Sequence, residues 1–429
     1  MTALKELVRL QFQTGEPNGF ILTQTPLGST TKKIAGLEDF RLDQNAVLDA
    51  DQLDGAKNFW LNVLDDTAEV TIYRGMALGA GGQPFPVAGQ LMASIASPEI
   101  DPFNSIQFRP NLKVRCQVYM DNAWKNLFTG RLREINSSYD VDGNVLVEFE
   151  ATDAIDDLNQ VVLDNFQVPA ENTGERIARI LTEGNFNTSL IPETTYHNFE
   201  MIDEELNQNA LDAALDAVAH EMGLLFVTNS NKFQFLKYGE VNTPVVTDPI
   251  FTNEDIDEDN KISMTGINMS SGKELFFNKC IGTTAYDANI YVKQGSISIE
   301  RYGLQVYENR NLKFDLGLSN DGEGNPIPVV GSGQTKVFAW LDKFLARWAD
   351  TPQEITYVGT RRFPKSVDVI NRVEDLKYPV VAEIGDQVNV NFQTPFVNLD
   401  QDSIILGIRH NLNPNRWITT FDLVPVPNN

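Results

Sequence analysis

The strongest constraint on the fold is a pair of alternating apolar runs near the carboxyl end of the chain. The alternating positions are Ile404, Leu406 and Ile408 in the first run, and Trp417, Thr419, Phe421 and Leu423 in the second. A spacing of two places these side chains on one face of a β-strand. Polar residues from Asn411 to Asn415 separate the runs, and Pro414 favours a turn there. The sequence therefore predicts a hairpin that completes a β-sheet.

Strand patterns also dominate the first 165 residues. β-Branched and aromatic residues, which are typical of strands, are concentrated in residues 59–64, 68–75, 112–120 and 145–153. A hairpin turn is expected at residues 140–144, because Gly143 tolerates a positive φ. Residues 74–90 contain many glycines and prolines, so we expect a loop there rather than a regular element.

Two helix-spaced patterns follow the first strand region. In residues 171–185, Asn172 and Glu175 resemble a capping box at the start of a helix. In residues 207–223 a second helix has an apolar stripe made of Leu211, Leu215, Val218 and Met222. A glycine ends this stripe, and a strand pair at residues 224–236 follows directly.

A third helix is expected at residues 335–350, where the apolar face is unusually heavy and includes Trp340 and Trp348. Its 3.6-residue spacing indicates a helix that packs on the core or on a partner. Strand patterns stand on both sides of it. Strand-rich regions interrupted by small α/β units indicate a mostly β protein with α+β insertions.

The composition disfavours several functions. Asp and Glu number 59 against 34 Lys and Arg, which gives a formal net charge of −25. A surface this negative repels nucleic acid, so sequence-specific DNA binding is disfavoured. No apolar run approaches the ~18 residues of a membrane span, and we expect neither a signal peptide nor a membrane anchor. Cys116 and Cys280 are too few for a disulfide framework and are expected to be buried thiols.

No catalytic or cofactor motif emerges from the sequence. The three histidines are His197, His220 and His410. His220 begins an incomplete metalloprotease motif, in which Leu224 replaces the second histidine. The glycines of residues 79–89 are followed by two prolines, which does not suit a dinucleotide-binding loop. We therefore expect no enzymatic activity and no cofactor.

One acidic segment partly matches the pattern of a calcium-binding loop. Asp255, Asp257 and Asp259 occupy the first, third and fifth positions of a calcium-binding loop. Asn260 replaces the glycine of such a loop, and Gly266 replaces its bidentate glutamate. The segment is therefore predicted to be an acidic turn before a strand, without a bound metal.

Several separated segments form an ordered series of motifs along the chain. The first segment contains Ile100, Asp101, Pro102, Arg109, Pro110, Trp124, Phe128 and Gly130. The others are residues 147–160, 210–236, 296–303, 383–390 and 405–425. None of the motifs is specific by itself, but their order over residues 60 to 425 resembles that in the tail hub proteins of long-tailed viruses (phages), also known as minor tail or baseplate-hub proteins.

The resemblance implies two β-barrel hub domains and two smaller α/β domains. The first barrel would comprise residues 1–165 and the first α/β insert residues 166–240. The second barrel would comprise residues 241–300 and the closing strands 371–429, with a second α/β insert at residues 301–370. The expected core and turn residues of the barrels are Trp124, Phe128, Gly130, Gly385, Gly407, Trp417 and Phe421. A glycine inside a strand pattern, such as Gly407, indicates a bulge or a close backbone approach.

The resemblance also implies a structural protein at the tail tip of the virion, made in the host cytoplasm. Three copies would form a pseudo-sixfold ring that joins the sixfold tail to threefold tip proteins and closes or gates the DNA channel. The implied partners are further copies of itself, the distal tail ring, the tape-measure protein, and tail-tip, fibre or receptor-binding proteins. Genome DNA would pass without specific binding. The alternatives are a hexameric distal tail ring protein and a carbohydrate-binding or cell-wall-degrading tail module.

Overall fold

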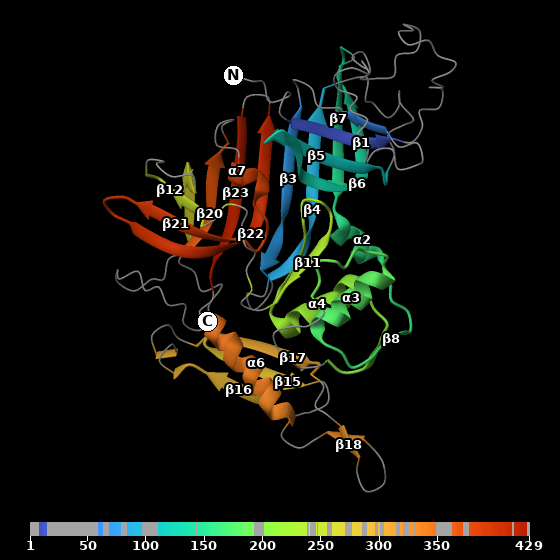
Figure 1. The fold of residues 1–429 in the computed structure, drawn as a ribbon, viewed down its shortest axis with the longest axis vertical. Coiled ribbons are helices and arrows are strands. Elements are labelled where there is room, and N and C mark those ends of the chain that lie inside the picture. The colour runs from blue at the N-terminus through green and yellow to red at the C-terminus, as the bar shows by residue number, and fades with distance from the viewer. Residues whose placement is uncertain are drawn as a thin grey trace.

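The chain has a mostly β structure with one large sheet and two smaller units that contain helices (Figure 1). This confirms the fold class expected from the sequence, whereas the number of barrels and the domain boundaries stay predictions. The computed structural model describes residues 8–14, 59–62, 68–78, 84–96, 110–142, 144–192, 201–237, 240, 246, 248–254, 260–270, 277–284, 290–296, 299–300, 304–314, 318–320, 326–328, 332–348, 363–371, 377–413 and 416–426.

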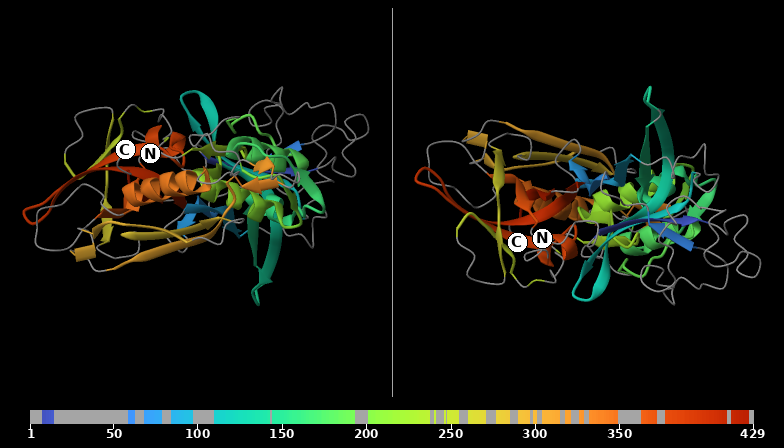
Figure 2. Two further views of the ribbon diagram at one scale, coloured as in Figure 1. Left: turned by 90° about the horizontal axis from the view of Figure 1, so that it is seen from below. Right: turned by 90° about the horizontal axis from the view of Figure 1, so that it is seen from above.

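The amino-terminal half of the large sheet is antiparallel. Its strands are β1 (Val8–Thr14), β2 (Phe59–Asn62), β3 (Glu69–Leu78), β4 (Pro84–Ile95), β5 (Lys113–Met120), β6 (Ala123–Tyr139) and β7 (Val145–Thr152), in the order β3-β4-β7-β6-β5-β1-β2. Val145, Val147 and Phe149 of β7 are buried, and the residues between them are exposed or partly buried. The period of two therefore decides which face of the strand covers the core. The hairpins β5–β6 and β6–β7 project on opposite sides of the molecule (Figure 2).

The carboxyl-terminal half of the sheet combines antiparallel and parallel pairs. Its strands are β12 (Ile250–Thr252), β13 (Lys261–Ser263), β14 (Gly266–Ser270), β20 (Phe363–Ile370), β21 (Gln387–Gln393), β22 (Asn398–Asn413) and β23 (Arg416–Pro425). The short helix α7 (Lys377–Val381) precedes β21. β12 runs parallel to both β13 and β21. Phe251 and Phe421 meet in the core of this half, with ring centres 5.0 Å apart.

β22 joins the two halves of the sheet. Residues 398–404 of β22 pair with β21, residues 403–413 with β23, and residues 407–412 with β3. The register with β23 shifts between Ile405 and Gly407, which marks a β-bulge. The bulge interrupts the alternation, so Ile404 and Leu406 pack in one core cluster and Ile408 packs in another. The common face predicted for these three residues is therefore wrong. The strand therefore changes neighbours at a bulge, and backbone pairing continues from β13 to β2.

The first helical unit follows β7. Its elements are α2 (Ala154–Gln160), β8 (Phe166–Val168), α3 (Thr173–Glu183), β9 (Glu204–Leu206), α4 (Ala210–Glu221), β10 (Leu224–Val227) and β11 (Phe233–Leu236). The capping box predicted at Asn172 and Glu175 is present in α3. The stripe predicted for α4 is wrong in part, because Leu211 and Leu215 are only partly buried. Small side chains instead let α2 and α3 approach α4, and these buried residues are Ala210, Ala213, Ala214 and Ala217.

The second helical unit is a three-stranded sheet covered on one face by a helix (Figure 1). It consists of β15 (Lys279–Thr284), β16 (Tyr291–Gln294), β17 (Val306–Leu312) and α6 (Ser332–Trp348), with a hairpin of β18 (Leu318–Asn320) and β19 (Pro326–Pro328). Val337, Trp340, Leu341 and Phe344 of α6 are fully buried. The heavy apolar face predicted for this helix is therefore core, although the side chain of Trp348 lies outside the described part.

Residues 74–78 and 84–90 form strands, where the sequence predicts a loop. β3 continues to Leu78 and β4 begins at Pro84, and the two strands pair with each other. Pro84 and Pro86 are tolerated because this part of β4 pairs with β3, whereas its pairing with β7 begins only at Gln90. A strand edge that has no partner strand does not need the N–H groups that proline lacks.

Gly130 of β6 allows a close approach between β6 and β7. A Cβ atom at this position would overlap the carbonyl oxygen of Thr152 and would also meet the ring of Phe128. We predict that Gly130→Ala lowers the free energy of unfolding by about 1–3 kcal/mol, the usual cost of overpacking a core. Denaturant unfolding measures this change.

The matched control is Gly266→Ala in β14, where the nearest atom to an added Cβ is the side-chain oxygen Oδ2 of Asp368, at 3.1 Å. We expect this variant to remain within about 0.5 kcal/mol of the unaltered protein, as is usual for sites away from the core. Equal losses in the two variants would contradict the close approach as the cause.

Candidate functional site: the junctions between the units

The residues predicted to form barrel cores lie in both halves of the large sheet. Phe128 and Phe421 are fully buried, and Trp417 is 3% exposed. Trp124 is only partly buried, because it stands beside the β5–β6 turn at the end of a strand pair. There the guanidinium carbon of Arg9 lies 4.0 Å from the centre of the Trp124 ring.

Glycines let the backbone segments around β22 approach one another. Gly407 lies at the register shift of β22 and faces Gly75 of β3. A Cβ atom on Gly75 would lie 3.0 Å from the Cα of Gly407. Gly385 has a φ of 88° before β21, and its N–H donates to the carbonyl oxygen of Ile405 at 2.8 Å. Gly75 was missed by the sequence analysis, because a glycine in a strand does not reveal which strand will face it.

A buried arginine connects three parts of the chain. Arg74 of β3 is 3% exposed, and its Nη1 lies 2.8 Å from Oε2 of Glu383, after α7. The same Nη1 donates to the carbonyl oxygen of Val227 in β10 at 3.5 Å. Oε1 of Glu383 accepts the N–H of Asn229 at 3.1 Å, and Oδ2 of Asp386 accepts the N–H of Glu383 at 3.0 Å. We call Arg74, Glu383, Asp386 and the neighbouring Asp153 the Arg74 cluster.

Two carboxyl groups of the Arg74 cluster carry raised pKa values. Burial raises the pKa of Asp153, the N-cap of α2, to about 7, and the charge of Arg74 opposes this only in part. Burial also raises the pKa of Asp386 to about 7, with a further contribution from the charge of Glu383. Both groups bind protons more tightly in the folded state than in the unfolded state. Their contribution to stability is therefore complete below pH ~4 and is lost as the pH rises through about 7.

His410 of β22 is buried and hydrogen-bonded within the closing hairpin. Its Nδ1 lies 2.9 Å from Oγ1 of Thr419 and accepts the indole N–H of Trp417 at 3.4 Å. Nδ2 of Asn371 donates to the same threonine oxygen at 2.7 Å. Burial, followed by the charge of Arg74, lowers the pKa of His410 to about 3. A neutral ring that accepts at Nδ1 links the two strands of the closing hairpin through their side chains.

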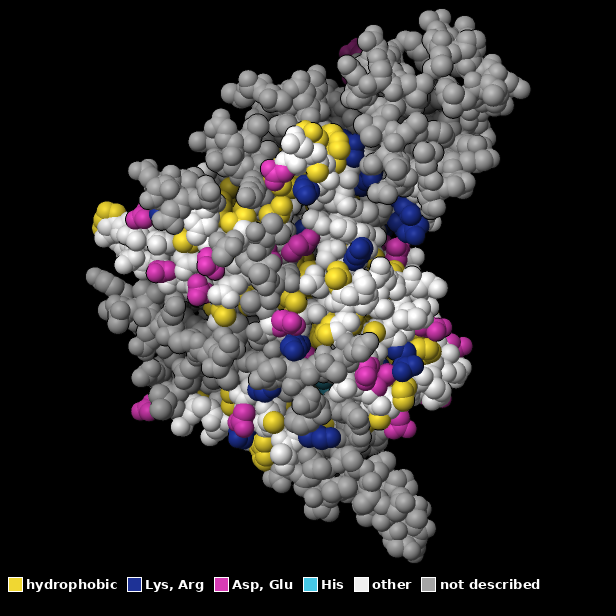
Figure 3. Space-filling view, in the orientation of Figure 1, with side chains coloured by type: hydrophobic (Ala, Val, Ile, Leu, Met, Phe, Trp, Pro, Cys, Tyr) yellow, Lys and Arg dark blue, Asp and Glu magenta, His cyan; other side chains and the backbone are white. Residues whose placement is uncertain are grey.

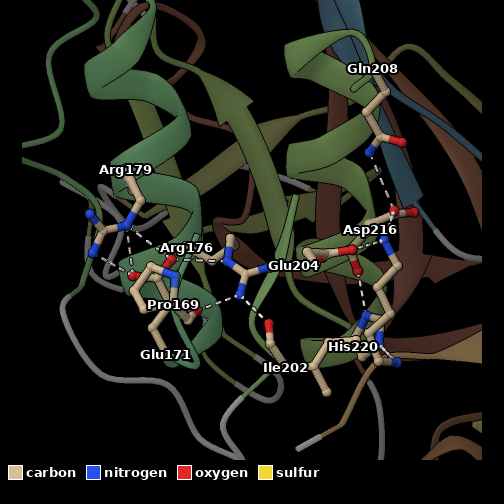
Figure 4. A network of polar contacts seen from close by, with 10 residues as sticks. Pro169, Glu171, Arg176, Arg179, Ile202, Glu204, Gln208, Asp216 and His220 are labelled. Carbon is tan, nitrogen blue, oxygen red and sulfur yellow. Dashed lines mark hydrogen bonds and ion pairs between the residues drawn. The ribbon is translucent and has the colours of Figure 1, made fainter. Parts of the chain in front are cut away.

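A second polar network holds α3 and the segments around it (Figure 4). Arg176 is 1% exposed, and its Nε and Nη1 each lie 2.9 Å from a carboxylate oxygen, of Glu171 and Glu204 respectively. Its Nη2 donates to the carbonyl oxygens of Pro169 and Ile202, at 2.9 and 2.7 Å. A buried charge with this many partners is stabilised by them, and removal of a partner would leave it uncompensated.

This network continues into the second helical unit through Lys313, which follows β17. Nζ of Lys313 lies 2.9 Å from Oε2 of Glu204 and 3.0 Å from Oδ2 of Asp216. The backbone N–H of Lys313 donates to Nε2 of His220, whose Nδ1 lies 2.6 Å from the carbonyl oxygen of Asp216. Nδ1 must therefore carry the proton of a neutral ring. Burial lowers the pKa of His220 below its usual value.

Both cysteines of the chain are buried free thiols. Burial raises the pKa of Cys116 and of Cys280 to about 12, which disfavours the thiolate that a nucleophile requires. Within the described ranges, no group of three or more His, Cys, Asp or Glu side chains could hold a metal ion. The same ranges contain no helix long and apolar enough to cross a membrane.

Several residues named in the sequence analysis lie outside the described residues. They are Ile100, Asp101, Pro102, Arg109, Gly143, His197, Asp255, Asp257, Asp259 and Pro414. The acidic segment therefore stays a predicted turn without a bound metal.

Replacement of Lys313 tests the junction between the two helical units. We expect Lys313→Met to lower the free energy of unfolding by about 1–3 kcal/mol, because Glu204 and Asp216 lose a charged hydrogen-bond donor. Residues 304–314 should also become more sensitive to limited proteolysis. Lys232→Met, at an exposed position in the β10–β11 turn, is the control and should change neither quantity. Similar effects in both variants would contradict a role of Lys313 in the junction.

The protonation of His220 gives a second test. Nitrogen-15 spectra at pH 7 should show the tautomer protonated at Nδ1, with its signal identified by its loss in His220→Gln. Because the pKa of the folded state lies below the usual 6.5, stability from this group is present above pH 6.5 and is lost as the pH falls below it. The acid-induced loss should therefore be smaller in His220→Gln. A ring protonated at Nε2 at pH 7 would refute the assigned hydrogen bond.

No family model matches the chain, and no curated protein matches it in sequence. Two of the solved structures that are similar in fold are tail proteins. The 43 kDa tail protein of prophage MuSo2 from Shewanella oneidensis has a TM-score of 0.51 at 10% identity, over 87% of this chain and 96% of that protein. The tail protein from Neisseria meningitidis MC58 has a TM-score of 0.52 at 10% identity, over 86% and 94%. The chain therefore has the fold of these two tail proteins over most of its length.

Proposed function

We propose that the protein is a structural component of a viral tail and forms the hub at the tail tip. The observation that carries this proposal is the fold shared with two tail proteins, which spans nearly the whole of each. The internal polar junctions support it, because their buried groups bind segments of the chain to one another. Such a molecule acts through its surfaces and not through a catalytic centre.

In this proposal the two halves of the large sheet are the two barrel modules of a hub. They are joined by the pairing of β22 with β3. Three copies then present six similar modules around one axis and can match a sixfold tail to threefold tip or fibre proteins. The partners would be the distal tail ring, the tape-measure protein, and fibre or receptor-binding proteins. The ring of three copies would close or gate the channel through which DNA leaves.

The charge of the chain supports a further part of this role. With a net charge of −25, the protein repels DNA, and an acidic inner wall would keep the genome from adhering during ejection. On the face shown in Figure 3, acidic and basic side chains of the described residues are interspersed. A neutral or basic channel lining in an assembled ring would refute this part of the proposal.

The number of copies in the assembly tests the hub directly. We expect the purified protein, or the ring released from tails, to have three times the mass of the 48.0 kDa chain by light scattering or native mass spectrometry. Six copies would instead support a distal tail ring protein. Labelling of the chain in electron micrographs of virions should place it at the tail tip, and a position elsewhere would overturn the proposal. Clearing of cell walls by the purified protein would support the degrading module in its place.

A further inference from the structure

The Arg74 cluster carries an excess of acidic groups over cations. The groups that face it are Arg74 from β3, Asp153 and Asp156 from the start of α2, Tyr378 from α7, Glu383 and Asp386 from the turn after α7, and His410 from β22. His410 is neutral, because burial and Arg74 lower its pKa to about 3. Asp156 has its own cation, because its Oδ1 lies 3.9 Å from Nη1 of Arg133. The guanidinium of Arg74 therefore faces the three remaining carboxyl groups, those of Asp153, Glu383 and Asp386.

The carboxyl groups of the cluster differ in their exposure to solvent. Asp153, Asp386 and Arg74 are each 3% exposed, whereas 19% of the Glu383 side chain is exposed. Arg74 forms its ion pair with Glu383, the carboxylate that keeps some contact with water. Asp153 and Asp386 have no such ion pair among the described contacts, so their ionised forms would be buried beside a charge that is already neutralised. Burial and neighbouring negative charges both favour the protonated form of a carboxyl group.

The members of the cluster come from both halves of the large sheet and from the first helical unit. Arg74 belongs to the amino-terminal half of the sheet, and Glu383 and Asp386 belong to the carboxyl-terminal half. The first helical unit joins them through its β10–β11 turn, where Asn229 donates its N–H to Glu383. Asn231 of the same turn accepts the N–H of Ala154 at 2.9 Å. Asp153 itself donates its N–H to the carbonyl oxygen of Gly89 in β4 at 3.1 Å, and its carboxylate leaves no room for a Cβ there.

We propose that the Arg74 cluster is a proton-loaded latch, which holds the first helical unit against both halves of the large sheet and loosens when Asp153 and Asp386 lose their protons. The closed latch contains one ion pair and two neutral carboxylic acids. Loss of both protons to solvent leaves three carboxylates around one guanidinium. Their mutual repulsion acts between the sheet, α2 and the turn after α7, so the β10–β11 turn separates from Glu383. Re-protonation restores the closed state.

Hydrogen exchange followed by mass spectrometry tests this latch in the full chain. The informative peptides contain the N–H groups of Asn229 and Ala154, and a peptide from β6 reports on the sheet. After correction for the intrinsic pH dependence of exchange, we expect protection of the first two peptides to fall at least tenfold between pH 6 and pH 8. Protection of the β6 peptide should change less than twofold over the same range.

The variants Asp153→Asn and Asp386→Asn replace each titrating acid with a neutral side chain of similar shape, which cannot lose a proton. Asparagine remains a good N-cap for α2, and at position 386 its amide oxygen can still accept the N–H of Glu383. In the double variant we expect the protection of the Asn229 and Ala154 peptides at pH 8 to be within twofold of their protection at pH 6. Asp212→Asn, at an exposed position on α4, is the matched control and should behave like the unaltered protein.

Two results would overturn the latch. One is a pH-independent protection of the Asn229 and Ala154 peptides in the unaltered protein, and the other is an unchanged pH dependence in the double variant. If the double variant fails to fold, the first result remains decisive. The test concerns the isolated chain and does not depend on the proposed hub, so either idea can fail while the other stands.

Discussion

The fold depends on the continuous backbone pairing between β3, β22 and β23. β3 and β22 pair across more than 300 residues of sequence, from Gly75 to Gly407. Loop closure over such distances costs entropy, and the many hydrogen bonds and buried side chains of one large sheet offset this cost. Both helical units are inserted between strands of that sheet. Their position therefore depends on that pairing.

The polar junctions fix how the helical units are oriented relative to the large sheet and to each other. Buried apolar contacts hold the units together, but apolar contact does not select one geometry as strictly as a hydrogen bond does. Arg74 connects β3, β10 and the turn after α7. Arg176 and Lys313 share Glu204, and Lys313 connects the two helical units. Each of these cations lies among several acceptors of fixed direction. A rigid arrangement of this kind suits a part that must present defined surfaces to neighbours in an assembly.

The sequence predicted those features that depend on local spacing. The closing hairpin, the capping box at Asn172 and the buried face of α6 follow from periods of two and 3.6 residues and from turn chemistry. Prediction failed at residues 74–78 and 84–90, which are strands and not a loop. Prolines are compatible with a strand that has a partner strand on one edge only, and the sequence does not show which edges have partners. Prediction failed at α4 because tight helix packing selects alanine over leucine at the contact.

The sequence by itself determined the mostly β class, the approximate places of the helices, the acidic charge and the order of segments that resembles tail hubs. Only the tertiary structure decided which strands are neighbours and which charged groups share an environment. The physical reason is that alternation and helical spacing are properties of adjacent residues. In contrast, the burial of Arg74 with Asp153 and Asp386 arises from contacts between distant segments. The pKa values of those acids follow from that burial and are therefore properties of the folded molecule alone.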